Sequence, residues 1–511
     1  MKTDKLIISG QDLTIADVVD VARHHRPVCI SQQSYKRMAV SRQLVEDCVN
    51  EARVIYGITT GFGKFADVSI SKEDSKQLQA NLIVSHACGV GEPITEEYVR
   101  AMMLLRINAL AVGNSGISQP TIDSLLALLN SQVVPYVPSK GSLGASGDLV
   151  PLAHMTLTLL GLGQAYYNGQ LMESYEALER ANLTPIELTS KEGLALINGT
   201  QAMNSYATLC VYDALNLNKV ADIVSALTME AVNAVIDAFD PRLHLLRHQD
   251  GQISTANNIR KLLSGSQRTS RQGQLRVQDA YTIRCVPQIH GPSKDATNYV
   301  DNIVSKEINA VTDNPIIFAD TNEAISGGNF HGQPLAMALD FLAIAMSELA
   351  DVSERRIERL VNSQLSGLPP FLVKNGGLNS GMMIPQYVAA SLVGENRVLS
   401  HPAVVDSITS SANQEDHVSM GMTAARKLKT IIDNVTNVLA IELLTATQAI
   451  DLGNDKATLG AGTKPAYQLV RSVVSFMEND RYISPDIHKC AELIRSGQLL
   501  DAVTSAIGQL E

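Results

Sequence analysis

The sequence predicts a mainly α-helical protein built on a long central helical bundle. Three stretches, Thr200–Asp240, Leu335–Ser366 and Met422–Leu452, contain neither Gly nor Pro and are rich in helix-forming residues. In the second stretch, apolar residues recur at intervals of three and four, which places them along one face of a helix. Helices of ~30–40 residues exceed the usual globular length and need partners along that length. We therefore expect a bundle that also serves an oligomer.

The loop-rich part of the chain precedes these helices. Glycines are dense between residues 57 and 147, and the texture changes near residue 200. Because Gly punctuates secondary structure, we expect an N-terminal domain over residues 1–200 and a long-helix domain over residues 201–511 that forms the oligomer core.

Composition excludes several classes of protein. The 511 residues are 45% hydrophobic and 18% charged, with a formal net charge of −11, 4% aromatic residues and no Trp. Such a chain is not mainly disordered, and it is poorly suited to nucleic acid or to an anionic membrane surface. The six Cys form no C-x-x-C pattern, and no apolar run is long enough for a signal peptide or a membrane span. We expect a cytoplasmic protein.

Nucleotide and metal motifs fail on spacing. The segment Gly57–Phe65 resembles a phosphate loop, but Ile58 occupies a position that requires Gly, and Phe65 follows Lys64 where Ser or Thr is needed. The histidines are scattered and form no HExxH pattern. We therefore expect no bound nucleotide and no metal.

The most informative segment is Pro138–His154, where small residues precede a predicted helix with Asp148 as its N-cap. Within it, Ala145-Ser146-Gly147 suits a backbone reaction. A Gly nitrogen has no Cβ beside it, so Gly147 N can be pressed against the Ala145 carbonyl carbon. Ring closure with loss of water, and loss of the Ser146 hydroxyl, gives 4-methylidene-imidazol-5-one (MIO), an electrophile made from the chain itself without an external cofactor.

This segment resembles the MIO-dependent aromatic amino-acid ammonia-lyases and aminomutases. Further segments agree in the family's order and cover most of the chain: Tyr56–Gly63, Asn198–Thr200, Gln278–Cys285, Asp313–Pro315 and Gly328–Gly332. The resemblance implies the mainly α ammonia-lyase/fumarase-like architecture, with the MIO in the loop-rich N-terminal part. It also implies a homotetramer whose active sites are shared between chains.

Two positions resemble the histidine-specific members of the family. Ser85-His86 and the segment Ala412–Ser419, which contains Glu415, match the residues that these members carry in the ring pocket. An imidazole N–H can be satisfied by His86 and by the Glu415 carboxylate, whereas a phenyl ring would leave that carboxylate unpaired. The expected reaction is non-oxidative elimination of ammonia from L-histidine to trans-urocanate.

The resemblance also implies roles for the remaining residues. Tyr56 is the expected base for the β-proton, and Arg284 is expected to pair with the substrate carboxylate. Asn198 and Gln278 are expected to bond the MIO or the substrate, and Tyr281 to lie beside the MIO. Tyr56 and Tyr281 could exchange roles. Phe330 is expected near the MIO, chiefly as a packing residue.

Other functions stay open at this point. A tyrosine or phenylalanine ammonia-lyase, or an aminomutase that returns the ammonia to the β-carbon, would use the same electrophile. A non-catalytic helical scaffold would keep the fold without the modified residues. A relative of fumarase or argininosuccinate lyase is disfavoured, because the Met-Pro-x-Lys pattern of those enzymes is missing.

Overall fold

The computed structural model describes residues 5–453 and 457–511, which are mostly helical. The described residues form two compact units. Unit 1 consists of the described residues within Met1–Tyr212, Asp301–Asp340 and Pro402–Arg426. Unit 2 consists of the described residues within Asp213–Val300, Phe341–His401 and Lys427–Glu511. The chain first leaves unit 1 close to the boundary expected at residue 200. It then returns to unit 1 twice, which the sequence pattern did not indicate, and the division into domains 1–200 and 201–511 stays a prediction.

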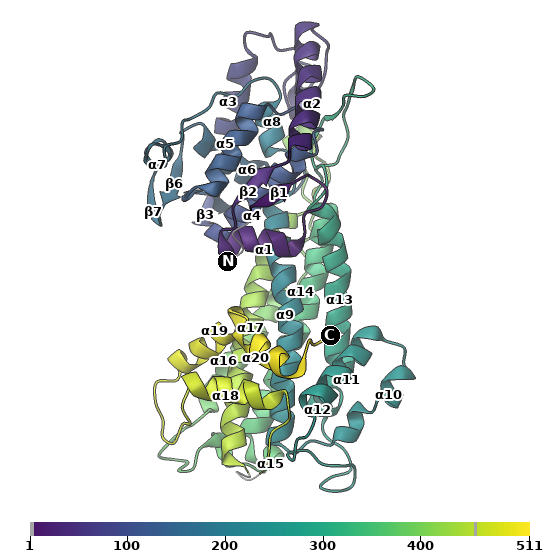
Figure 1. The fold of residues 1–511 in the computed structure, drawn as a ribbon, viewed down its shortest axis with the longest axis vertical. Helices are drawn as coiled ribbons and strands as arrows, with labels where there is room; N and C mark the ends of the chain where they lie inside the picture. Colours follow the sequence, from purple (N-terminus) through teal and green to yellow (C-terminus); the bar gives the residue numbers. More distant parts are fainter. Residues whose placement is uncertain (1–4, 454–456) are drawn as a thin grey trace. The chain divides into compact units, whose positions relative to one another are not determined.

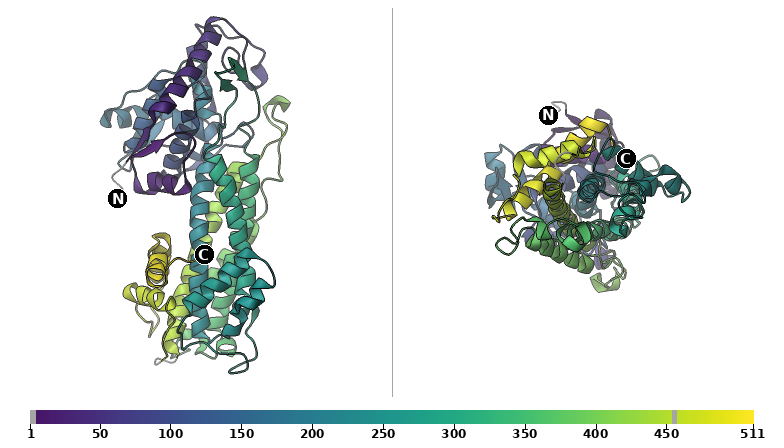
Figure 2. Two further views of the ribbon diagram at one scale, coloured as in Figure 1. Left: turned by 45° about the vertical axis from the view of Figure 1, so that its right-hand side comes forward. Right: turned by 90° about the horizontal axis from the view of Figure 1, so that it is seen from below.

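Four long helices contribute residues to both units (Figures 1 and 2): α9 (Gln201–Ala231), α13 (Val286–Glu307), α14 (Gln333–Val361) and α17 (Gly421–Leu452). Three of them confirm the predicted helical stretches. Helix α9 ends before the predicted limit, because Asn233 has a φ of +50° and the Ala234 N–H returns to the Met229 carbonyl, a pairing that closes a helix C-terminus. Helix α17 is long and apolar enough to span a bilayer, but 83% of its most apolar window is buried inside the protein, as in a core helix.

Unit 1 is built around α4, whose residues are buried from Tyr98 to Ala111. Helices α3, α6 and α8 pack on one another, and a short antiparallel pair joins β3 to β5. This pair connects the chain just after α3 with the chain just before α6. The other sheets are the parallel pair β1–β2, the antiparallel β4–β6–β7 and the hairpin β8–β9.

The remaining elements of unit 1 are short to medium in length: β1 (Leu6–Ile8), α1 (Ile15–His24), β2 (Val28–Ile30), α2 (Gln32–Asn50), η1 (Gly63–Phe65), α3 (Ser75–His86), β3 (Val90–Pro93), α4 (Glu96–Ala111), α5 (Gln119–Asn130), β4 (Val133–Pro135), β5 (Pro138–Lys140), α6 (Leu149–Leu159), β6 (Gln164–Tyr167), β7 (Gln170–Glu173), α7 (Ser174–Arg180), α8 (Glu192–Ile197), β8 (Ile316–Phe318), β9 (Glu323–Ile325) and η4 (Ser411–Asn413).

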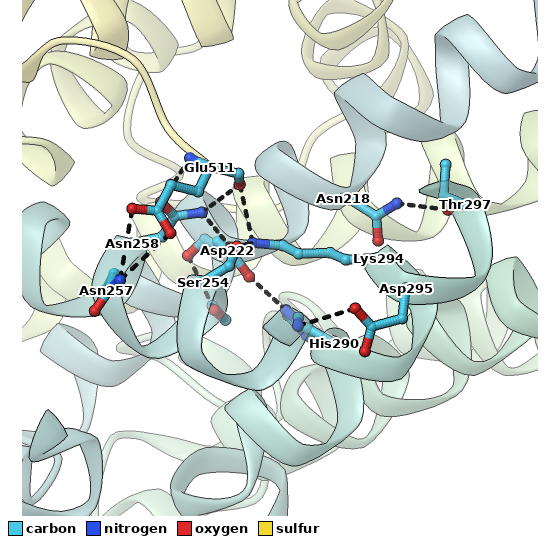
Figure 3. Close-up of polar contacts among 12 residues, drawn as sticks. Asn218, Asp222, Ser254, Asn257, Asn258, His290, Lys294, Asp295, Thr297 and Glu511 are labelled. Carbon is cyan, nitrogen blue, oxygen red and sulfur yellow. Dashed lines mark hydrogen bonds and ion pairs between the residues drawn. The ribbon is translucent and has the colours of Figure 1, made fainter. Parts of the chain in front are cut away.

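In unit 2, buried polar contacts join the long helices. Arg356 of α14 donates from Nε and Nη2 to the two carboxylate oxygens of Glu442 in α17, at 2.6 and 2.8 Å, and the Thr228 hydroxyl of α9 donates to the same carboxylate at 2.7 Å. His290 of α13 lies 3.3 Å from Arg356 Nη1. Figure 3 shows its other contact, with Asp222 of α9, in which His290 Nδ1 lies 2.8 Å from the carboxylate. These contacts confirm the predicted bundle.

The shorter elements of unit 2 are all helical: η2 (Ile236–Phe239), α10 (Pro241–Leu245), α11 (Asp250–Leu262), α12 (Tyr281–Arg284), α15 (Ser363–Ser366), η3 (Pro370–Leu372), α16 (Met383–Leu399), α18 (Thr463–Val473), α19 (Ser484–Arg495) and α20 (Gln498–Ile507).

Candidate active site

Unit 1 contains a cavity of about 1200 Å³, called the site cavity below. Most of the predicted site residues line it. These are Tyr56, His86, Ala145, Ser146, Asn198, Phe330 and Glu415. They come from all three chain segments of the unit, so the fold gathers residues that the sequence separates widely.

The segment before α6 is pressed against its neighbours at two glycines. Gly144 and Gly147 have φ values of +73° and +71°, a region that L side chains rarely adopt. A Cβ on Gly147 would lie 2.3 Å from the Gly199 carbonyl oxygen, and one on Gly144 would lie 2.2 Å from the Ser419 hydroxyl. Both positions therefore require glycine. The segment of small residues before α6 is bent at residues 144–148, and it is confined by Gly199 and by Ser419.

Asp148 fixes the end of this turn. Its backbone N–H donates to the Gly199 carbonyl at 2.7 Å, and its buried carboxylate accepts from the Met203 N–H at 2.7 Å and from the Ser142 hydroxyl at 2.8 Å. Burial raises the pKa of Asp148 to about 6, and those two donors oppose the rise. Asp148 is the N-cap residue of α6 as predicted, but its side chain makes no bond to that helix. It binds the first turn of α9 instead, because the unpaired N–H groups there attract a buried anion.

Ser146 contacts the one carboxylate predicted for the ring pocket. Its hydroxyl donates to Glu415 Oε1 at 2.6 Å, and the Ser410 hydroxyl donates to Glu415 Oε2 at 3.2 Å. Backbone bonds in both directions join Ser410 to Glu415, and Ser411, Ala412 and Asn413 between them all have positive φ. This strained loop holds the carboxylate over Ser146.

His86 ends helix α3 beside the same carboxylate. Its Nδ1 lies 3.0 Å from the Ser85 hydroxyl. Burial lowers the pKa of His86, while the Leu82 carbonyl and the negative charge of Glu415 oppose the decrease. A neutral His86 therefore faces the site cavity near neutral pH and can donate or accept one hydrogen bond there.

Tyr56 lies at the start of the Gly-rich loop. Its hydroxyl accepts a hydrogen bond from the Gly63 N–H at 3.2 Å, which fixes the oxygen at the wall of the site cavity. The loop turns at Gly57 and Gly63, with φ values of +66° and +54°. Its 3₁₀ turn η1 contacts η4, the turn that precedes Glu415.

Only the nitrogen of the Asn198 side-chain amide has a hydrogen-bond partner among the described residues. Asn198 follows α8, and its Nδ2 donates to the Asn314 carbonyl at 3.2 Å. Its Oδ1 is buried and has no hydrogen-bond partner among the described residues. A buried carbonyl oxygen of this kind is costly unless something satisfies it, so Asn198 presents an acceptor to whatever occupies the cavity.

Four predicted residues do not line the site cavity: Gly147, which follows Ser146 in unit 1, and three residues of unit 2. Gln278, Tyr281 and Arg284 belong to unit 2. Tyr281 is 68% exposed, and the Arg284 guanidinium lies over its ring at 4.7 Å from the centroid. Arg284 Nε is buried without a hydrogen-bond partner in the described chain.

Two histidines of the cavity wall were missed by the sequence reasoning. His331 and His417 stack with 5.8 Å between ring centroids and an interplanar angle of 8°. They were dismissed as scattered histidines, although each stands within two residues of a predicted site residue, Phe330 or Glu415. That adjacency was the available signal. In residues 5–453 and 457–511, no group of three or more His, Cys, Asp or Glu side chains is placed to hold a metal ion.

Comparisons with known proteins found extensive similarity in sequence and in fold. The chain matches the profile of the family described as aromatic amino acid lyase over residues 13–472. It is 56% identical to a histidine ammonia-lyase of Alkaliphilus oremlandii over 503 residues, which are 98% of this chain and 99% of that protein. The crystal structure of histidine ammonia-lyase from Trypanosoma cruzi is 41% identical with a TM-score of 0.92, covering 99% of this chain and 96% of that one. Tyrosine aminomutase from Streptomyces globisporus is 36% identical with a TM-score of 0.96, covering 99% of this chain and all of that one.

Proposed function

The chain belongs to the aromatic amino acid lyase family, and from this premise we propose that it eliminates ammonia from L-histidine to give trans-urocanate. The observation that supports the substrate assignment is the position of Glu415. Its Oε1 accepts a hydrogen bond from the Ser146 hydroxyl at 2.6 Å, and its negative charge opposes the decrease in the pKa of His86. An imidazole ring between these two groups satisfies both with its own N–H and nitrogen acceptor. This would be the first step of histidine degradation.

Residues Ala145, Ser146 and Gly147 fit the MIO that the family resemblance implies. The backbone at Gly144 and Gly147 lies so close to Ser419 and Gly199 that a Cβ would not fit, and a segment confined in this way supports ring closure by holding the reacting groups in place. The orphan Oδ1 of Asn198 offers an acceptor at the same wall. When present, the MIO supplies an electrophilic alkene that turns the substrate amine into a better leaving group.

The chain's own residues then have distinct tasks. Tyr56 would take the β-proton onto its phenolic oxygen, which the Gly63 N–H holds in place. His86 and Glu415 would orient the imidazole, and Asn198 would accept a hydrogen bond from the substrate or the MIO. Phe330 would pack against the bound ring.

Residues of unit 2 would complete the site from neighbouring chains. We propose a cytoplasmic homotetramer in which Gln278, Tyr281 and Arg284 serve the site cavity of another subunit. Their separation from the cavity lining and the exposure of Tyr281 support this assignment. Arg284 would hold the substrate carboxylate through its guanidinium fork.

The test is urocanate formation from L-histidine by the wild type, by Ser146→Ala and by Ser139→Ala, a control in the strand that leads into the turn. Wild type and Ser139→Ala should be two water molecules lighter than the unmodified chain and should be active. Ser146→Ala should have the unmodified mass and no activity at unchanged helix content. Turnover of tyrosine or phenylalanine but not histidine, or formation of a β-amino acid, would instead indicate the alternative lyases or an aminomutase.

A further inference from the structure

Helix α8 carries an unusual residue at each end. Asn198, which lines the site cavity, follows its last residue. Lys191 precedes its first residue with a φ of +72°, and its side chain is completely buried. A left-handed lysine backbone and a buried ammonium group are each costly. The fold keeps both at one position, next to a helix that has only two turns.

Both ends of this helix are tied to the same dipeptide. Lys191 Nζ lies 2.8 Å from Asp313 Oδ2, with both side chains at most 1% exposed. The other oxygen of Asp313 accepts from the Asn314 N–H at 2.7 Å, and the Asn314 carbonyl accepts from Asn198 Nδ2. Asn314 Oδ1 also accepts from the Gly327 N–H at 2.7 Å, in the loop that leads to Phe330. The ion pair is thus two hydrogen bonds away from the Asn198 amide.

Arg106 of α4 also connects helix α8 with the chain just before Asp313. Its guanidinium donates to the Ala195 carbonyl in α8, to the Thr312 carbonyl at 3.2 Å and to Gln201 Oε1 at 3.0 Å. Helix α8 and the chain just before Asp313 therefore share one rigid donor group. Among the described residues of this network, Asn198 Oδ1 is the buried side-chain atom without a hydrogen-bond partner, and Asn198 lines the site cavity.

We propose that Lys191, through its ion pair with Asp313, is a positioning residue for the reaction: it fixes helix α8 so that Asn198 Oδ1 points into the site cavity. The proposal rests on the proposed function. A buried ion pair is a weak source of net stability, since hydrophobic side chains of similar volume often serve as well. Orientation of a group in the site is a role that hydrophobic side chains cannot fill.

Unit 2 provides a matched control pair. Lys294 Nζ lies 2.8 Å from Asp222 Oδ2, also in a buried setting, and donates to the Ser254 hydroxyl at 3.1 Å (Figure 3). Its partners Asp222, Ser254 and Glu511 are not predicted site residues. Lys294→Met therefore removes the same chemistry as Lys191→Met without an effect on Asn198.

The experiment compares kcat, KM, intact mass and thermal unfolding for wild type, Lys191→Met, Lys294→Met, Asn198→Ala and the double variant Lys191→Met/Asn198→Ala. Lys191→Met should lose about 100-fold in kcat, the scale of a misplaced active-site group, with the mass still two waters lighter. The double variant should be no slower than Asn198→Ala within about threefold, because residues that act through one another are not additive. Lys294→Met should lower the unfolding midpoint and keep kcat within about threefold of wild type.

Three results would overturn the proposal: wild-type kcat in Lys191→Met, losses that multiply in the double variant, or an unmodified mass for Lys191→Met. If Lys191→Met does not fold, Asp313→Asn replaces it, since its amide oxygen can still accept from the Asn314 N–H. Asp313→Asn should lower kcat about tenfold, and a wild-type kcat in this variant would also overturn the proposal. If the wild type turns over tyrosine or phenylalanine in place of histidine, the proposed function fails, and the same comparison is made with that substrate.

Discussion

Replacing Glu415 with Gln changes the charge of the site cavity and leaves its shape almost intact. The carboxylate is half-buried and receives hydrogen bonds from Ser410 and, before MIO formation removes its hydroxyl, from Ser146; an amide oxygen can also accept these bonds. A hydrogen bond to a charged group contributes about 1.5–3 kcal/mol and a neutral one about 0.5–1.5 kcal/mol. The lost difference for the substrate imidazole is about 1.4 kcal/mol, or about tenfold in kcat/KM for histidine.

Phenylalanine should respond in the opposite way. Its ring has no N–H, so it leaves the Glu415 carboxylate unpaired, and the neutral Gln removes part of that cost. The assay is kcat/KM for both substrates in wild type, Glu415→Gln and Glu187→Gln, a control at a carboxylate whose side chain is 85% exposed. The preference for histidine should fall at least about tenfold in Glu415→Gln alone. Equal losses for both substrates, or an unmodified intact mass for Glu415→Gln, would refute the reasoning.

Four further outcomes are expected. Gly147→Ala should fold with the unmodified mass and no activity, because the new Cβ meets a backbone oxygen at 2.3 Å, whereas Gly169→Ala, also at positive φ but with nothing within 4 Å, should mature and stay active. Asp148→Asn should gain stability relative to wild type as the pH rises from 4 to 7. Burial raises the pKa of Asp148 to about 6 from the ordinary 3.8, so the wild type loses about 3 kcal/mol of folding stability as this carboxyl ionises. A difference in unfolding free energy between the two proteins that does not change with pH would contradict this prediction. Tyr56→Phe should lower kcat by about 10²–10⁴-fold with little change in KM, and a wild-type kcat would remove Tyr56 as the base. Co-expression of Tyr56→Phe with an inactive Arg284→Leu chain should restore activity if sites are shared between subunits, and no restoration would place both residues in one chain's site.

The long helices were predictable because their signal is local. Stretches without Gly or Pro and with apolar residues every three or four positions gave α14 and α17 to within a few residues. The early end of α9 depends on one left-handed Asn, which a composition argument does not detect. Asp148 is the predicted N-cap residue, but the partner of its side chain was not predictable for a different reason: a tertiary partner, the start of α9, competed with the helix that Asp148 precedes.

The site was predictable as a set of residues and not as an arrangement. Motif positions identified Tyr56, His86, Ser146, Asn198 and Glu415, all of which line one cavity. Glu415 joins the other four only because the chain returns to unit 1 at residues 402–426, which no spacing rule gives.

The supporting charges beneath the site were not predictable. Lys and Arg are normally solvent-exposed, so nothing in the sequence marked Lys191 or Arg106 as fully buried.

The contact between Ser146 and Glu415 spans 269 residues of sequence. At a translation rate of roughly 5–20 residues per second, Glu415 leaves the ribosome roughly 13–54 s after Ser146. During that interval the nascent chain contains the three small residues of the turn but neither Ser419, which crowds Gly144, nor the loop that covers Ser146. Under the proposed function, the reactive alkene would therefore form only after the loop that contains Glu415 has been synthesised, and until then the segment would expose an unreactive serine.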